Sequence, residues 1–185
     1  MKGPTPGGAA RTTAPWIVAA AVAGGLLLAP GAGAAAQETA ARQAPAAPCP
    51  TKQLIANSAE RTGNNQMRIT VINDGPKVCV LKGFPTVALA GQGSPDRNKP
   101  LNVARQGQAR AVQLPVGGRA TTQLTFTPVL GEADGYCASG AEPTVAPSIV
   151  LGVGGGGLQL SPADGGEFAL CGTTVRATAF RGSGS

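Results

Sequence analysis

The sequence predicts an all-β, immunoglobulin-like antiparallel β-sandwich of about seven to nine short strands, with an N-terminal signal helix. Short segments in which apolar and polar residues alternate recur about every ten residues. Turn-forming residues separate them, in a chain that holds 28 glycines and 16 prolines. After the N-terminal region no segment has helical period. A closed barrel would satisfy the same pattern and stays open as an alternative.

The N-terminal region indicates an export signal. Lys2 and Arg11 supply positive charge before an apolar run at 16–28. That run is short for a membrane span, which needs about 20 apolar residues. Small residues then offer a cleavage site after Ala36, with Ala34 as the second choice. An uncleaved anchor is the alternative, and it would be the protein's one membrane contact.

Two further segments lack the patterns of folded structure. The Ala/Pro/Gln-rich stretch has no apolar periodicity and predicts a disordered spacer. The Gly/Ser-rich C-terminal stretch is expected to bury nothing. The expected organisation is a signal peptide (1–36), a spacer (37–48), one β-sandwich domain (49–181) and a disordered tail (182–185).

The charge distribution argues against a nucleic-acid partner. The chain has 15 basic and 9 acidic residues, and loss of Lys2 and Arg11 with the signal leaves 13 basic residues in the mature chain. These basic residues form no run, and the aromatic residues that remain after cleavage are Tyr136 and four phenylalanines. Nucleic-acid surfaces combine clustered Lys/Arg with stacking aromatics. We therefore expect a soluble surface.

Four cysteines and the absence of histidine define the chemistry of the chain. No C-x-x-C pair occurs, which disfavours structural zinc and thioredoxin-like redox activity. An even number of cysteines in an exported chain implies disulfides, and four cysteines allow three connectivities. The chain is expected to be secreted or associated with the cell envelope. The cysteines are Cys49, Cys79, Cys137 and Cys171.

The first clear strand covers residues 66–73, where Met67 and alternate apolar residues share one face and Arg68 the other. The most regular strand covers residues 119–127, with Thr121 and every second residue on a polar face. Such alternation is typical of half-buried antiparallel strands. Residues 91–100 show turn chemistry throughout. Further strands are predicted at 77–81, 86–90, 108–114, 148–153, 158–160 and 175–180.

The segment CVLKGFPTV at 79–87 and ITVIN at 69–73 resemble the secreted actinomycete Domain of Unknown Function 4232 family. The pattern L-P-x-G-G-x-A at 114–120 is similar to the family as well, as are the positions of Cys137 and Cys171. C-x-L-x-G-[FY]-P is the most specific of these motifs. One departure is a segment unusually rich in glycine at 152–157, which predicts a flexible hairpin and lacks the ending of a phosphate loop.

The resemblance implies an exported, disulfide-containing β-sandwich and no particular activity. The order of the family's motif blocks favours the pairs Cys49/Cys79 and Cys137/Cys171. On the chain-entropy model each such bridge stabilises the fold by roughly 3 to 4 kcal/mol.

Few residues are suited to catalysis or cofactor binding. Without histidine a Ser-His-Asp triad is impossible, and no S-x-x-K motif occurs. Met67 alone is a poor copper ligand set, so no metal and no cofactor are expected. The lysines of the mature chain lie in loops or beside turns and are expected to be solvated. They are Lys52, Lys77, Lys82 and Lys99.

Two pairs of acidic residues are the remaining catalytic candidates. Glu132 and Asp134, or Asp164 and Glu167, could in principle act as paired carboxylates or contact calcium loosely. Both pairs lie in glycine-rich segments, where acidic residues most often face water or accept turn hydrogen bonds. We expect no enzyme activity, and a carboxylate-based hydrolase is the weakest hypothesis.

The favoured function is a non-catalytic extracellular module that binds a protein or a cell-envelope component through loops at one end of the sandwich. The alternative is a secreted protease inhibitor that acts through the exposed loop 91–100, with Arg97 or Lys99 in a trypsin-like pocket. No cysteine brackets that loop, whereas inhibitors gain affinity from rigid segments.

Overall fold

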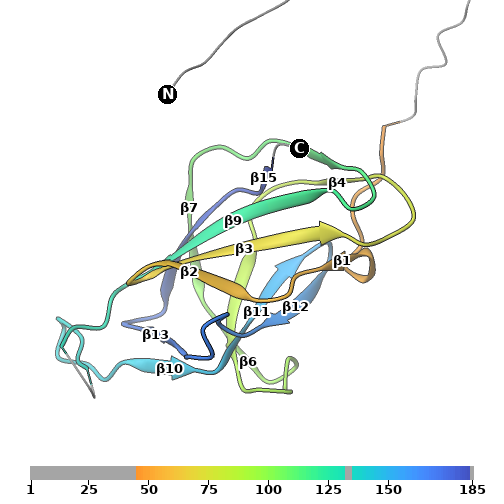
Figure 1. Ribbon diagram of the computed structural model, residues 1–185. Helices are drawn as coiled ribbons and strands as arrows, with labels where there is room; N and C mark the ends of the chain where they lie inside the picture. Colours follow the sequence, from red (N-terminus) through yellow and green to blue (C-terminus); the bar gives the residue numbers. More distant parts are fainter. Residues whose placement is uncertain (1–44, 132–134, 184–185) are drawn as a thin grey trace, which may run out of the picture. The chain divides into compact units, whose positions relative to one another are not determined.

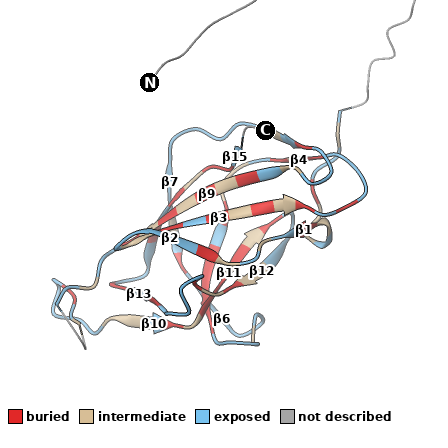
Figure 2. Cartoon of the chain, viewed as in Figure 1, coloured by how far each residue is buried: buried red, intermediate tan, exposed pale blue. Residues whose placement is uncertain are grey.

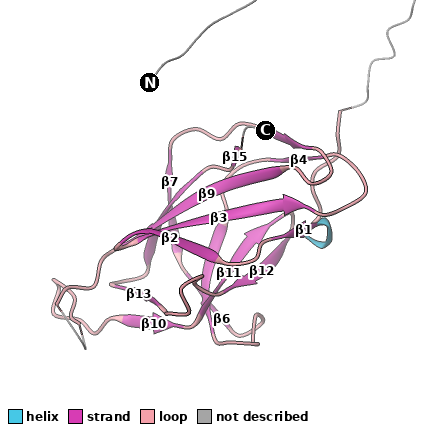
Figure 3. Cartoon of the chain, in the orientation of Figure 1, coloured by secondary structure: helices cyan, strands magenta, loops and turns pink. Residues whose placement is uncertain are grey.

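The computed structural model describes residues 45–131 and 135–183, and over these residues the chain is all-β. A single 3-10 turn, η1 (Thr51–Gln53), accompanies the strands (Figures 1 and 3). The all-β prediction is confirmed. The signal helix predicted within residues 1–36 lies outside the described residues. Among the residues that are described, no helix has the length and apolar character needed to cross a membrane.

The larger sheet contains seven strands built around the antiparallel pairs β3/β9 and β9/β14. β14 also pairs with β7 in parallel, so the sheet is mixed. Its strands are β1 (Leu54–Ile55), β2 (Ala59–Gly63), β3 (Gln66–Asn73), β7 (Asn102–Gln106), β9 (Arg119–Phe126), β14 (Thr174–Thr178) and β15 (Arg181–Gly182).

The second main sheet has four antiparallel strands in the order β12-β11-β5-β6. Two smaller pairs, β4/β8 and β10/β13, complete the described part. The strands of the second sheet are β5 (Thr86–Ala90), β6 (Asn98–Pro100), β11 (Ser148–Val153) and β12 (Gly156–Leu160). The smaller pairs are β4 (Cys79–Leu81) with β8 (Val112–Leu114), and β10 (Thr144–Ala146) with β13 (Phe168–Leu170).

A single hydrophobic core lies between the two main sheets. Every second residue of β3 and β9 is buried, as the alternating colours of Figure 2 show. Ile69 of β3 and Leu124 of β9 belong to the same core cluster as Leu89 of β5 and Ile149 of β11. The inner faces of two sheets therefore share one core, which is the defining feature of a β-sandwich. This arrangement confirms the sandwich predicted from the sequence.

The described residues form fifteen strand segments, more than the seven to nine predicted. The additional segments are mostly two or three residues long, too short to show a period of two. One of them, β6, occupies the end of the 91–100 segment, which was predicted to be turn throughout. Residues 98–100 pair with β5, and the chain then crosses to β7 in the larger sheet.

The ends of the domain extend beyond the predicted boundaries. Ala47, assigned to the disordered spacer, accepts a hydrogen bond at 2.8 Å from the backbone N–H of Val80. Gly182, assigned to the disordered tail, pairs with Ala120, and the next N–H, of Ser183, donates to the Arg119 carbonyl. Backbone pairing of this kind leaves no side-chain pattern in the sequence. Residues 37–44 and 184–185 lie outside the described residues.

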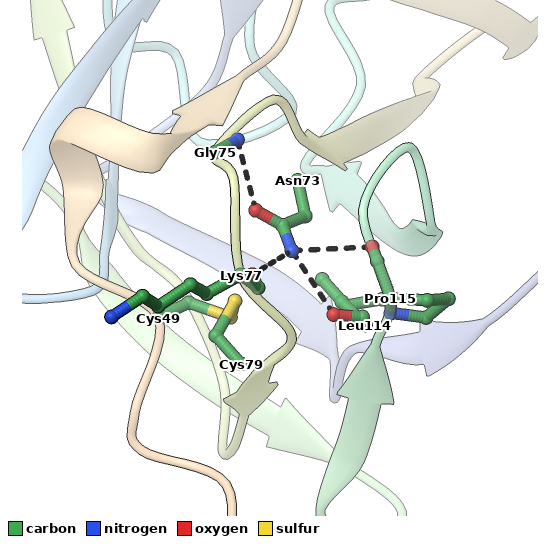
Figure 4. Close-up of a disulfide and its surroundings, with 7 residues drawn as sticks. All are labelled: Cys49, Asn73, Gly75, Lys77, Cys79, Leu114 and Pro115. Carbon is green, nitrogen blue, oxygen red and sulfur yellow. Dashed lines mark hydrogen bonds between the residues drawn. A yellow bond between two sulfur atoms is a disulfide. The ribbon is translucent and has the colours of Figure 1, made fainter.

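Asn73, at the end of β3, connects two loops through its buried side chain (Figure 4). Its Nδ2 donates to the carbonyls of Lys77 at 2.9 Å, Leu114 at 3.0 Å and Pro115 at 3.1 Å. Its Oδ1 accepts from the N–H of Gly75 at 3.1 Å. The amide thus satisfies backbone groups that would otherwise be buried without partners.

The hairpin between β11 and β12 is a two-residue turn at Gly154 and Gly155, with φ values of 61° and 83°. Positive φ at both positions is typical of a type I′ turn. The turn contacts η1, where the Thr51 N–H donates to the Gly154 carbonyl at 3.2 Å and the Thr51 hydroxyl donates to the carbonyl of Val153. The glycine-rich segment is therefore a tight hairpin held by the N-terminal turn.

Replacing Asn73→Ala is expected to lower the free energy of unfolding by about 2 to 4 kcal/mol, because several backbone groups lose their partner. Urea denaturation with the disulfides intact measures this loss. Asn57→Ala is the control, since Asn57 is exposed, and it should change stability by less than about 0.5 kcal/mol. Equal stability of the two variants would refute the connecting role of Asn73.

Gly154→Ala is expected to destabilise the protein more than Gly155→Ala. Both positions have positive φ, which costs an L-residue roughly 1 to 2 kcal/mol. A Cβ at Gly154 would in addition collide with the Cys49 carbonyl, whereas a Cβ at Gly155 meets nothing within 4 Å. The extra loss at Gly154 should be at least about 1 kcal/mol. Thermal unfolding of the matched pair tests this, and a larger effect at Gly155 would contradict it.

Candidate functional site

The structure joins Cys49 to Cys79 and Cys137 to Cys171, the pairs favoured from the sequence. The Cα atoms are 4.8 Å and 5.5 Å apart, respectively. Backbone hydrogen bonds reinforce both, from the N–H of Cys49 to Val80 and from the N–H of Cys171 to the Thr127 carbonyl. The first disulfide lies close to Asn73 (Figure 4). With no free thiol among the four cysteines, their role is to hold the fold.

Of the two acidic pairs, only Asp164 and Glu167 fall within the described residues, because residues 132–134 are outside them. The Arg61 Nε donates to Asp164 at 2.7 Å, and its Nη2 donates to the backbone carbonyl of Glu167 at 3.5 Å. The N–H of Gly166 donates to the same Asp164 carboxylate. These hydrogen bonds, with that from Arg61 the strongest, hold the pKa of Asp164 below its ordinary value of 3.8. Asp164 therefore acts as an ion-pair partner in an exposed turn.

The loop proposed for protease inhibition is folded rather than extended. The N–H of Ser94 donates to Gly91, and the N–H of Arg97 donates to Ser94. Lys99 lies outside this turn, in β6, opposite Leu89 of β5. The two cations that the sequence placed on one loop thus occupy a turn and an edge strand.

The remaining sequence candidates occupy unremarkable positions. Met67 is buried in the core with 2% of its surface exposed. Among the described residues, no group of three acidic, cysteine or histidine side chains is placed to hold a metal ion. The lysines are exposed in η1, in the turn after β3, directly after β4 and in β6, namely Lys52, Lys77, Lys82 and Lys99.

The outer face of the seven-stranded sheet carries a concentration of polar side chains. Because side chains alternate along a strand, the residues of β3, β9, β14 and β15 that are not in the core point outward together. We call this surface the arginine–threonine face. Its arginines are Arg68, Arg119, Arg176 and Arg181.

Strand pairing arranges the face in rows that cross β9. Thr121 lies between Thr70 of β3 and Arg181 of β15. In the adjacent row Gln123 lies opposite Arg68. Directly opposed residues of an antiparallel pair lie on the same side of the sheet, about 5 Å apart. The rows therefore place guanidinium groups on both sides of a central line of hydroxyl and amide groups.

A break between β14 and β15 shapes the centre of the face. Phe180 is buried, and its N–H donates to the Gly83 carbonyl at 3.2 Å, so the chain leaves the sheet at this residue. Thr178 compensates for the missing ladder bonds of β9. Its hydroxyl accepts from the N–H of Gln123 at 2.9 Å, and its carbonyl accepts from the Thr122 hydroxyl at 2.7 Å. The backbone N–H of Gln123 and the side-chain hydroxyl of Thr122 therefore both have partners at the break.

A hollow of about 230 Å³ lies at this break, lined by Arg68, Arg181, Gln123 and hydroxyl groups that include that of Thr121. Arg181 also lines a second hollow, of about 470 Å³, together with Arg110. Arg181 is therefore common to the linings of the two hollows. We call the two hollows together the groove, and its arginines are Arg68, Arg110 and Arg181.

The groove has an excess of positive charge. In the part of the chain that the structure describes, the two ion pairs are Arg61 with Asp164 and Arg68 with Glu60. The second is loose, at 3.8 Å, and both of its side chains are more than half exposed. Exposed ion pairs of this kind contribute little to the free energy of unfolding, with a median of about 0 to 1 kcal/mol. Arg181 and Arg176 form no ion pair in this part of the chain, so their charge is available to a ligand.

The sequence patterns predicted the direction of these side chains but not their grouping. Arg68 and Thr121 were placed on the polar faces of their strands, and both are there. Arg181 was missed because it follows the last predicted strand. The pairing of β9 with β15 joins residues about 60 positions apart, and no local pattern encodes such a contact.

The chain was compared with models of known protein families. The model of the family described as Domain of unknown function (DUF4232) matches residues 49–181. The chain belongs to this family. The family resemblance inferred from the sequence is thereby confirmed. The comparison with curated proteins gave no match, and neither did the comparison with solved structures.

The motifs of this domain of unknown function have structural roles in the chain. Cys79 forms a disulfide, and the carbonyl of Gly83 accepts the N–H of Phe180 at the break. Leu114 and Pro115 provide carbonyl groups that bind the Asn73 amide. The family motifs thus maintain the scaffold behind the arginine–threonine face. Arg68, Arg176 and Arg181 lie outside these motifs, and Arg119 occupies a variable position of the 114–120 motif.

Arg61→Gln is expected to raise the pKa of Asp164 toward 3.8, because the guanidinium that favours the carboxylate is removed. In the native protein the ion pair between Arg61 and Asp164 stabilises the fold at pH values above the ordinary pKa of Asp164. This stabilisation is lost as the pH falls through the lower pKa that Asp164 has in the folded state. A carboxyl ¹³C NMR titration measures the shift. Arg97→Gln is the control and should leave the Asp164 titration unchanged. The same midpoint in wild type and Arg61→Gln would refute the assignment.

Proposed function

We propose that this chain is an exported, non-catalytic module that binds a cell-envelope component through its arginine–threonine face. The observation that carries the proposal is the groove in which Arg68 and Arg181 flank hydroxyl and amide groups on the central strands of a sheet. Guanidinium groups are the preferred partners of carboxylates and phosphates, which they bind with two parallel hydrogen bonds.

The chemistry of the groove suits binding better than catalysis. Arginine stays protonated in proteins and cannot exchange a proton as a general acid or base. In the first hollow the side chains beside the threonine hydroxyls are arginine and glutamine, and neither can act as a general base for a hydroxyl. Hydrogen bonding and charge are therefore what this surface offers to a ligand.

The groove is organised before a ligand arrives. Gln123 Nε2 donates to Gln66 Oε1 at 2.8 Å, and the backbone N–H of Gln123 donates to the Thr178 hydroxyl. These contacts fix side chains that would otherwise lose conformational freedom on binding. Sites built on strands also hold their geometry better than sites on loops. The sheet face is thus a better binding surface than the end loops favoured from the sequence.

Two features support export. Disulfides form and persist in oxidising compartments outside the cytoplasm, and all four cysteines are paired. The N-terminal region also has the charge and apolar run of a signal peptide. An exported module of this kind meets the cell envelope first.

The arginines of the groove give a direct test. Arg68→Gln/Arg181→Gln is expected to weaken binding to a purified cell-envelope fraction of the producing organism by about 10- to 100-fold, because two charge-assisted contacts are lost. Co-sedimentation at fixed salt measures the affinity. Arg97→Gln/Lys99→Gln removes the same charge from loop 91–100 and should change the affinity less than about twofold.

The variant Arg97→Gln/Lys99→Gln also distinguishes envelope binding through the groove from protease inhibition through loop 91–100. If the protein blocks trypsin and Arg97→Gln/Lys99→Gln abolishes the block, loop 91–100 is the functional surface. Equal weakening of envelope binding by the two double variants would show that overall charge, and not the groove, is responsible. Either result would overturn the proposed binding surface.

A further inference from the structure

We infer that the ligand of the groove is a linear acidic polysaccharide, with sugar carboxylates on Arg68 and Arg181 and sugar hydroxyls on the threonines between them. This inference rests on the proposed function and specifies its ligand. It is drawn from the charge of the groove, the type of its polar groups and their regular spacing.

The charge of the groove requires an anionic ligand. Arg181 is shared by both hollows and has no acidic partner among the described residues. Arg110 lines the second hollow, and Arg68 has only the loose contact with Glu60. A neutral ligand would compensate the desolvation of these guanidinium ions less well than an anion, whose charge-assisted hydrogen bonds are stronger. A ligand with acidic groups at intervals satisfies them.

The polar groups between the arginines indicate a hydroxylated ligand. Thr121 and Thr178 line the first hollow, and Thr70 lies opposite Thr121. Each carries a hydroxyl, a group that can donate and accept hydrogen bonds, and the hydroxyl of Thr178 already accepts the Gln123 N–H. Sugar hydroxyls have the same dual character, so sugar and threonine groups can satisfy each other. A polyanion without hydroxyls, such as polyphosphate, only accepts hydrogen bonds. It would bind the donors of the groove and leave the acceptor positions of the threonine hydroxyls to water.

The regular spacing of the face indicates an extended ligand. Arg68 of β3 and Arg181 of β15 lie on the two strands that flank β9. Neighbouring strands are about 4.8 Å apart, and alternate residues along a strand about 6.8 Å apart. The two arginines lie in adjacent rows, opposite Gln123 and Thr121, so the backbones that carry them are about 12 Å apart on a diagonal across the sheet. A polymer lying across the strands meets both, and Arg181 also lines the second hollow together with Arg110.

The face lacks the features that other macromolecules require. Protein interfaces need apolar or aromatic anchors near the centre, and the centre here is Thr121 and Gln123. Of the six large apolar side chains that are exposed in the described part, only Ile55 lies in this sheet, in its short strand β1. Single-stranded nucleic acids need exposed aromatic rings for stacking. The one phenylalanine that lines the groove, Phe180, is 3% exposed.

Polygalacturonate is a suitable probe, because it combines one carboxylate and free hydroxyls in every sugar. Isothermal titration at fixed ionic strength should show binding to the wild-type protein and at least tenfold weaker binding to Arg68→Gln/Arg181→Gln. Arg97→Gln/Lys99→Gln should bind within about twofold of wild type. Dextran and fully methyl-esterified polygalacturonate, which lack the charge, should not bind.

A second variant tests the hydroxyl groups separately from the charge. Thr121→Val keeps the size and β-branching of the side chain and removes its hydroxyl. It should weaken polygalacturonate binding by about three- to tenfold and leave the weaker binding of poly-L-glutamate unchanged. An equal effect on both polymers would overturn the assignment of sugar hydroxyls to the threonine row.

The remaining outcomes are distinguishable. Binding of single-stranded DNA or poly-L-glutamate as tight as that of polygalacturonate, at equal charge concentration, would overturn the polysaccharide inference. Absence of polygalacturonate binding, with envelope binding that still depends on Arg68 and Arg181, would also overturn it and would leave the proposed function standing. Envelope binding independent of these arginines would overturn both.

Discussion

The side-chain amide of Asn73 is the interaction on which the rest of the structure depends. It holds the turn after β3 and the carbonyl groups that follow β8 in one place. The backbone of Asn73 adds to this, since its N–H donates to Gly118 and its carbonyl accepts from Gly117. The start of β9 is therefore fixed against the end of β3. That contact sets the register of the two central strands, and a shift of one residue would reverse the two faces of β9.

The core and the arginine–threonine face are consequences of the same alternation. In β3, Ile69 is fully buried and the adjacent Arg68 is exposed, and in β9 Leu124 is fully buried and the adjacent Gln123 is half-buried. The tight packing of one side keeps the backbone of these strands in place. The other side is then free to carry polar groups without loss of stability, because its residues contribute little to the core.

The sequence was sufficient for features with a local cause. The alternation in residues 66–73 and 119–127 predicted β3 and β9 with their faces, and 86–90 predicted β5 with the bounds that the structure has. The favoured cysteine pairing came from a family resemblance rather than from local pattern.

Features that depend on partners distant in the sequence were missed. The strand pairing of Gly182 and of residues 98–100 is backbone pairing, which side-chain type does not determine. The groove was missed for the same reason, since the break at Phe180 depends on a carbonyl almost a hundred residues earlier.

The position of β14 has a consequence for the order of assembly. This strand lies between β9 and β7, although it comes after both in the chain. Until residues 174–178 have joined, β9 and β7 have no neighbour on that side and the larger sheet is incomplete. When the chain emerges with its N-terminus first, the larger sheet cannot be completed until the C-terminal strands are available. Under the export that we propose, such a delay would keep the chain unfolded until translocation is nearly complete.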